Sequence, residues 1–160
     1  MLRELTDVMI AEKKLFEELI YIVKEQKVAM IERDLEKMTS LSDKMEELLF
    51  EIDKVDSERH KLFNIYKRRL GLDEDSSFDE ILNKIDGEER ENFVDSTGDF
   101  LLILNELATE LHGMKEMMEF EKSYFDFVMS LLSEDTGKAV YSNDGKSYSD
   151  TARNILDVRW

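Results

Sequence analysis

The sequence predicts an all-α fold: a bundle of three long antiparallel coiled-coil-like helices, with a short connector helix and a C-terminal tail. The 160 residues contain no proline and only six glycines, so few positions can break a helix. Apolar residues recur at steps of three and four over long stretches, which is the period of an amphipathic helix. Apolar runs stay far below the roughly 18 residues that a membrane-spanning helix needs.

The charge balance excludes two classes of partner. Twenty-two basic and 38 acidic side chains give a formal net charge of −16, which repels phosphate backbones and anionic lipids. We therefore expect no nucleic-acid binding and no membrane insertion. The sequence begins without the features of a signal peptide and contains no cysteine, which favours a cytoplasmic location.

Two long helices are predicted first, over residues 4–33 and 34–70. The first has two adjacent apolar stripes, so it should contact more than one neighbour. Asp34 can cap the second helix, which predicts a hairpin turn at Arg33-Asp34; a single bent helix is the alternative. Arg59 interrupts the apolar seam of the second helix, and Glu12 has a matching position in the first. A hairpin would bring these two within salt-bridge distance.

A connector and a third long helix follow. Gly71 should end the second helix, and the capping box Ser77-Phe78-Asp79-Glu80 predicts a short helix over 78–86 that Gly87 closes. The third long helix covers 88–133, so the helical bundle is expected to span residues 1–133. Its seam runs at strict three- and four-residue steps. The members are Phe93, Thr97, Phe100, Leu104, Leu107, Leu111, Met114, Met118, Glu121, Phe125, Val128 and Leu132.

Residues 134–160 are predicted to be a tail that becomes ordered on contact with another surface. Several apolar side chains in the tail lie outside every heptad seam, so nothing in the three long helices requires them. We expect these residues to bind a protein partner. They are Val140, Tyr141, Ile155, Leu156 and Trp160.

The sequence offers little material for catalysis. Two histidines, no cysteine and no glycine-rich phosphate loop predict no catalytic residue, no metal site and no cofactor, so the chain is not expected to be an enzyme. One exception is His112-Gly113-Met114-Lys115, which resembles the phosphoacceptor motif of histidine phosphotransfer proteins. Phosphotransfer through His112 and a generic coiled-coil adaptor both remain alternatives.

The order of these features resembles the FlgN family of flagellar type III export chaperones. The first helix reaches a break at Asp34-Leu35-Glu36, a helix rich in lysine and leucine follows with Lys44 to Leu49, and Arg59 comes later. After the third helix stands a tyrosine with a glycine turn, Tyr141-Ser142-Asn143-Asp144-Gly145.

The resemblance implies a cytoplasmic chaperone for the hook-associated junction proteins of the flagellum. Such a chaperone would bind their amphipathic terminal helices, keep them soluble, and release them at the membrane export gate. An apolar helix face needs a cover before assembly, and an acidic helical bundle could supply one. The oligomeric state stays open, and a dimer is one alternative.

Overall fold

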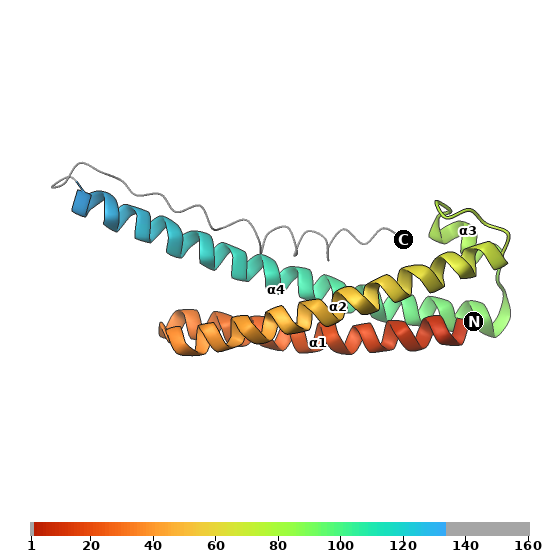
Figure 1. Cartoon of the computed structure of the whole chain (residues 1–160). Helices are drawn as coiled ribbons and strands as arrows, with labels where there is room; N and C mark the ends of the chain where they lie inside the picture. Colours follow the sequence, from red (N-terminus) through yellow and green to blue (C-terminus); the bar gives the residue numbers. More distant parts are fainter. Residues whose placement is uncertain (1, 134–160) are drawn as a thin grey trace. The chain divides into compact units, whose positions relative to one another are not determined.

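The structure is a computed structural model that describes residues 2–133, and these residues form four helices (Figure 1). They are α1 (Leu2–Glu32), α2 (Leu35–Arg69), α3 (Phe78–Leu82) and α4 (Gly87–Ser133). The predicted all-α fold with three long helices is confirmed. The five predicted partner-binding residues of the tail, Val140 to Trp160, lie outside the described residues.

A tight turn joins α1 to α2, as the hairpin prediction required. Arg33 adopts a left-handed conformation with φ of 57°, although glycine is the residue that usually does so. The Asp34 carboxylate then accepts a hydrogen bond from the backbone N–H of Lys37 at 3.0 Å, which caps the start of α2. The alternative of one bent helix is therefore wrong.

The connector is shorter than the sequence predicted. Ser77 and Glu80 form the expected capping box, but α3 ends at Leu82 rather than at residue 86. Ile81 and Ile85 are both buried, and a turn between them lets the chain bury Ile85 outside a helix. Gly87, with φ of 54°, opens α4 instead of closing α3, because a left-handed residue lets the chain change direction there.

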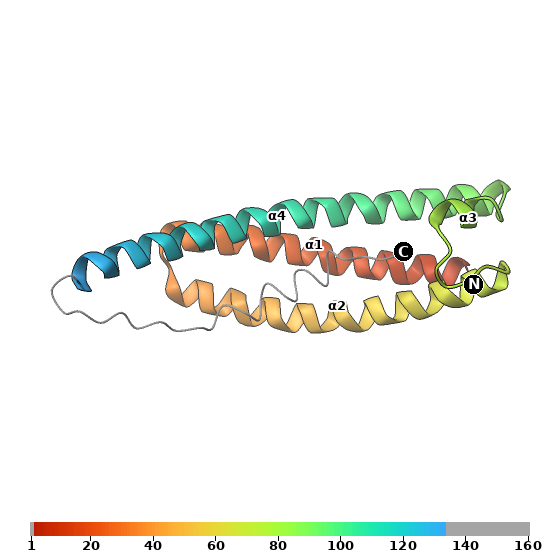
Figure 2. The ribbon, with the colours of Figure 1, turned by 90° about the horizontal axis from the view of Figure 1, so that it is seen from above.

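The chain divides into two units, and the boundary lies inside α4, at residues 107 and 108. The bundle over residues 1–133 stays a prediction, since this division does not test it. In the first unit, α1 lies beside α2 and beside the first half of α4 (Figure 2). The Phe16 ring of α1 contacts the Phe100 ring of α4, with 5.7 Å between the ring centroids. This double contact agrees with the two apolar stripes of the α1 sequence.

An aromatic cluster closes the other end of the first unit. The Phe93 ring of α4 lies 6.3 Å from Phe63 and 6.0 Å from Tyr66 on α2, and 5.3 Å from Phe78 on α3. The Tyr66 hydroxyl donates to the Glu89 carboxylate at 2.9 Å. Burial and this acidic neighbour raise the pKa of Tyr66 above its usual range. The cluster joins three helices through one buried ring.

Candidate protein-binding surface

The residues of α4 after Leu107 contain no buried side chain up to residue 132. The predicted seam is buried from Phe93 to Leu107, and beyond that point the same spacing continues on an exposed helix. Monomeric proteins rarely expose a continuous apolar surface of this kind without using it for binding. The large exposed apolar residues of this segment are Met118, Phe120, Tyr124, Phe125, Phe127, Met129, Leu131 and Leu132.

These side chains form two stripes on the helix. The first, which we name the methionine stripe, continues the buried seam. It consists of Leu111, Met114, Met118, Phe125, Val128 and Leu132, with Met129 at its edge and Glu121 near its centre. Met118, Phe125 and Leu132 are 47%, 61% and 64% exposed, and Leu111, Met114 and Val128 are half-buried.

The second stripe, the aromatic stripe, consists of Met117, Phe120, Tyr124, Phe127 and Leu131. Its steps of three, four, three and four residues repeat the heptad spacing, and at 100° per residue it lies about a third of a turn from the methionine stripe. Phe120 is 71% exposed, and Tyr124, Phe127 and Leu131 are 52%, 59% and 56% exposed. This stripe was not predicted from the sequence, although its spacing of three and four residues is visible there.

Apart from Glu121, the charged side chains of this segment lie on the rest of the helix. Lys115 and Lys122 follow the outer edge of the methionine stripe, and Lys115 lies 3.9 Å from Glu119. His112 lies on the polar side, 70% exposed, with its Nε2 atom 3.3 Å from the Glu116 carboxylate. An exposed histidine with an acidic neighbour is ordinary for a solvated helix face, so this geometry gives phosphotransfer no support.

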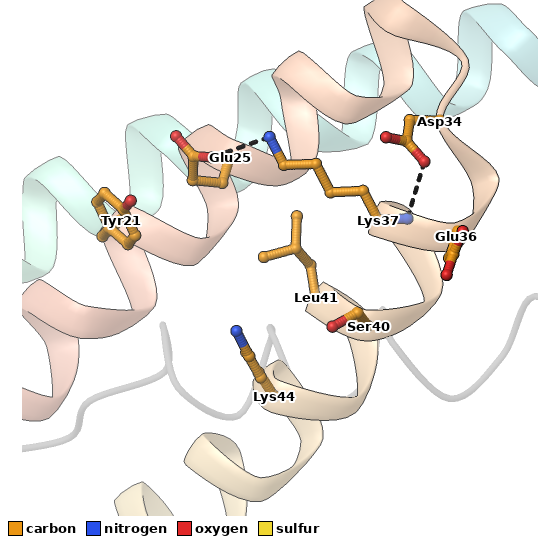
Figure 3. Close-up of a pocket in the computed structure, with 8 residues that line it drawn as sticks. All are labelled: Tyr21, Glu25, Asp34, Glu36, Lys37, Ser40, Leu41 and Lys44. Atoms are coloured by element: carbon orange, nitrogen blue, oxygen red, sulfur yellow. Dashed lines mark hydrogen bonds and ion pairs between the residues drawn. The ribbon is translucent and has the colours of Figure 1, made fainter.

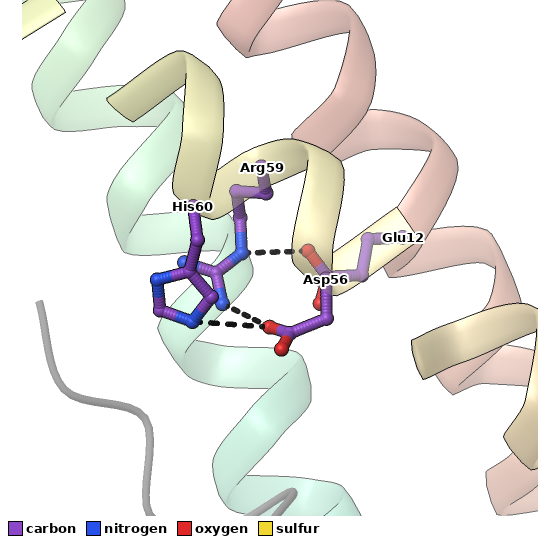
Figure 4. Close-up of polar contacts among 4 residues, drawn as sticks. All are labelled: Glu12, Asp56, Arg59 and His60. Atoms are coloured by element: carbon purple, nitrogen blue, oxygen red, sulfur yellow. Dashed lines mark hydrogen bonds and ion pairs between the residues drawn. The ribbon is translucent and has the colours of Figure 1, made fainter. Parts of the chain in front are cut away.

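A buried ionic cluster lies in the first unit, where the sequence predicted a pair (Figure 4). The Arg59 Nε atom donates to Glu12 Oε2 at 2.7 Å, and both residues are almost fully buried, which confirms the predicted salt bridge. Arg59 also donates to Asp56 at 2.5 Å, and its guanidinium lies 5.1 Å from the centroid of the Phe100 ring. One guanidinium therefore links α1, α2 and α4.

Burial raises the pKa of Glu12 from 4.5 to about 7. Arg59 opposes this shift, but Asp56 shares the same guanidinium and repels a second negative charge, so the three groups together would carry a net charge of −1. The Oε1 atom of Glu12 is buried and accepts no hydrogen bond from the described residues. A proton on this carboxyl group would reduce the cost of burying it.

The hairpin end carries a shallow pocket of about 450 Å³ between α1 and α2 (Figure 3). Three of its polar lining residues are already paired: the Lys37 ammonium lies 3.1 Å from Glu25, and Asp34 accepts from the Lys37 backbone. A ligand would have to displace these contacts, so we do not regard the pocket as a binding site. Within the described part of the chain, no group of histidine, aspartate and glutamate side chains could hold a metal ion.

Comparison with known protein families identifies the family of this chain. The model of the family described as FlgN protein matches residues 1–149. The chain belongs to the FlgN family. This family is associated with flagellar chaperone function and not with catalysis. No curated protein and no solved structure matches the chain significantly.

The FlgN match leaves the phosphotransfer and adaptor alternatives without support. Neither of the two long helices of the hairpin, nor α4, is apolar enough to cross a membrane over the residues that the structure describes. Among residues 2–133 of this FlgN chain, the exposed apolar surface of α4 between Met114 and Leu132 is a candidate for binding a protein.

Proposed function

We propose that this chain is a cytoplasmic export chaperone that binds the amphipathic terminal helices of flagellar hook-associated proteins through the methionine stripe of α4. The exposed continuation of the α4 seam beyond Leu107 carries this proposal. Helices of the first unit bury the α4 seam up to Leu107. The same side-chain spacing continues on the exposed part of α4 in the second unit, where it can receive a helix of another protein.

The composition of the stripe suits a chaperone. Met114, Met118 and Met129 have flexible side chains that can adapt to differently shaped partner helices, so one surface can accept more than one client. Phe125 near the middle offers a large apolar anchor. Glu121 interrupts the stripe, so the best client presents a basic or hydrogen-bonding residue at that level, and Lys115 and Lys122 favour acidic residues along one flank.

The acidic surface supports the same function. Because the chain has a net charge of −16, complexes of the chain with an apolar client helix repel one another. The client would be released at the membrane export gate, where it leaves the cytoplasm. Val140, Tyr141, Ile155, Leu156 and Trp160 remain predicted contacts of the client or of the gate.

The test is titration calorimetry of the full chain with a synthetic terminal helix of a hook-associated protein. We expect Phe125→Asp to raise the dissociation constant at least about tenfold, because a charge at the anchor must be buried against the client. Phe50→Asp is the matched control, since Phe50 on α2 is 63% exposed and Phe125 is 61% exposed. Circular dichroism would verify that both variants keep their helices.

Two results would contradict the proposal. If Phe125→Asp and Phe50→Asp bind as well as the wild type, the methionine stripe is not the binding surface. If removal of residues 134–160 abolishes binding while Phe125→Asp leaves it intact, the binding surface is the tail that the sequence analysis proposed.

A further inference from the structure

The aromatic stripe of α4 needs an occupant of its own. One partner helix covers an apolar face about 100° wide, and the two stripes together are about twice as wide. A client on the methionine stripe therefore leaves Phe120, Tyr124, Phe127 and Leu131 largely in water. We propose that the aromatic stripe pairs with the aromatic stripe of a second copy of this chain, in an antiparallel arrangement.

The spacing of the stripe favours antiparallel pairing. Phe120 and Phe127 take one type of seam position and Tyr124 and Leu131 take the other, so an antiparallel pair places unlike positions opposite each other. Phe120 then faces the second copy's Leu131, and Tyr124 faces the second copy's Phe127. The four layers consist of large apolar side chains only, and each central layer stacks two aromatic rings.

The charges along the stripe permit self-pairing in spite of the acidic chain. In this register Ser123 lies opposite the second copy's Ser130, and both are exposed hydroxyl residues. Glu121 on the other flank faces the second copy's Val128 rather than another carboxylate. Asp126, Glu119 and both lysines of the segment point away from the stripe, as their positions on the helical wheel require. Among the described residues, no like charges face each other across these four layers.

The expected interface is small. The four stripe residues that are 52% to 71% exposed offer about 100 Å² each, given about 150–250 Å² for a whole aromatic side chain. With the flanking atoms, the two copies would bury about 1,000 Å² in total, which is at the lower limit for a specific complex. The dimer should therefore dissociate readily, and added salt should strengthen it by screening the repulsion between two acidic chains.

Sedimentation velocity of the full chain over a range of concentrations tests the proposal. We expect a concentration-dependent dimer that Phe127→Asp converts to monomer, while Phe125→Asp on the methionine stripe leaves it dimeric. These two phenylalanines have nearly equal exposure, 59% and 61%, so they form a matched pair. A wild-type chain that stays monomeric at every concentration would overturn the proposal, as would equal loss of the dimer in both variants.

Disulfide trapping tests the orientation. The chain contains no cysteine, so single cysteines can be introduced without removing any. In the antiparallel register, Phe120 faces Leu131 of the second copy in an end layer, so Phe120→Cys mixed with Leu131→Cys should form a mixed disulfide. Either variant alone should not, because its two copies of the cysteine lie beyond the about 7 Å Cα separation that a disulfide spans. Efficient linking of Phe120→Cys to itself would contradict the antiparallel arrangement. Neither experiment involves a client, so their failure would leave the proposed chaperone function untouched.

Discussion

Replacing Glu12 by glutamine should change how the stability of the first unit depends on pH. Glutamine has the shape of glutamate and can still accept the hydrogen bond from Arg59, but it carries no charge at any pH. The wild-type carboxyl group is buried, and its pKa is raised from 4.5 to about 7. Every other carboxylate is present in both proteins, so the difference between the two stability curves isolates Glu12.

The sign follows from the raised pKa. Below pH 4.5 Glu12 is protonated in the folded and the unfolded chain, and its ionisation does not affect stability. As the pH rises to about 7, the unfolded chain releases the proton more easily than the folded chain, so the wild type loses stability. A shift from 4.5 to about 7 corresponds to about 3 kcal/mol in full, of which about 2 kcal/mol falls between pH 5.5 and pH 8.5.

Urea unfolding followed by circular dichroism at several pH values between these limits is a suitable assay, because this range avoids the isoelectric point near 4.5. We expect the free energy of unfolding of Glu12→Gln, relative to the wild type, to increase by about 2 kcal/mol over the range. Glu17→Gln, which removes an exposed carboxylate from the same helix, should run parallel to the wild type. Parallel curves for Glu12→Gln would show that Arg59 outweighs burial and keeps Glu12 ionised throughout.

Three further substitutions test the packing of the first unit by the same unfolding assay. Arg59→Leu leaves the buried Glu12 without its cation and should cost about 3–5 kcal/mol at neutral pH, a loss that Glu12→Gln in the same chain should partly restore. Arg33→Gly should stabilise the hairpin by up to about 1 kcal/mol, because position 33 has φ of 57°, which glycine adopts without strain. A loss of stability would mean that the Arg33 side chain contributes more to stability than the backbone strain costs. Phe93→Ala should cost about 3–5 kcal/mol because the ring is the centre of the aromatic cluster, whereas Phe120→Ala, on an exposed ring, should change stability little.

Local signals in the sequence predicted the hairpin turn and the salt bridge between Glu12 and Arg59. Asp34 sits where the heptad phase changes, and a carboxylate that caps a helix acts within one turn of it. The pairing of Glu12 with Arg59 follows from the position of that turn, because a hairpin fixes which residues of α1 and α2 share a level. The end of α3 was missed because burial of Ile85 in a turn depends on tertiary packing, which overrides the helical pattern.

The extent of the buried core could not be predicted in the same way. The seam of α4 keeps its spacing from Phe93 to Leu132, and spacing alone says that a helix face is apolar without saying what covers it. In the structure the face is buried to Leu107 and exposed after it. Partner binding was predicted in the tail because its apolar residues lie outside every seam, and that prediction falls outside the described residues. The exposed part of α4 is a second candidate surface that the structure adds.

The two proposed contacts of α4 are geometrically connected. In an antiparallel pair, equivalent flanks of the two helices lie on the same side. Since Glu121 and Val128 lie on the side of the methionine stripe that is nearer the aromatic stripe, both methionine stripes of the dimer would face that side together. A client helix placed there would contact α4 of both copies and bury more apolar surface than it could on one copy.

Phe127→Asp should then weaken client binding although it leaves the methionine stripe unchanged, and the wild-type affinity for the client should increase with the concentration of the chaperone. Equal client affinity for the wild type and Phe127→Asp at concentrations where the wild type is dimeric would show that the client uses a single copy.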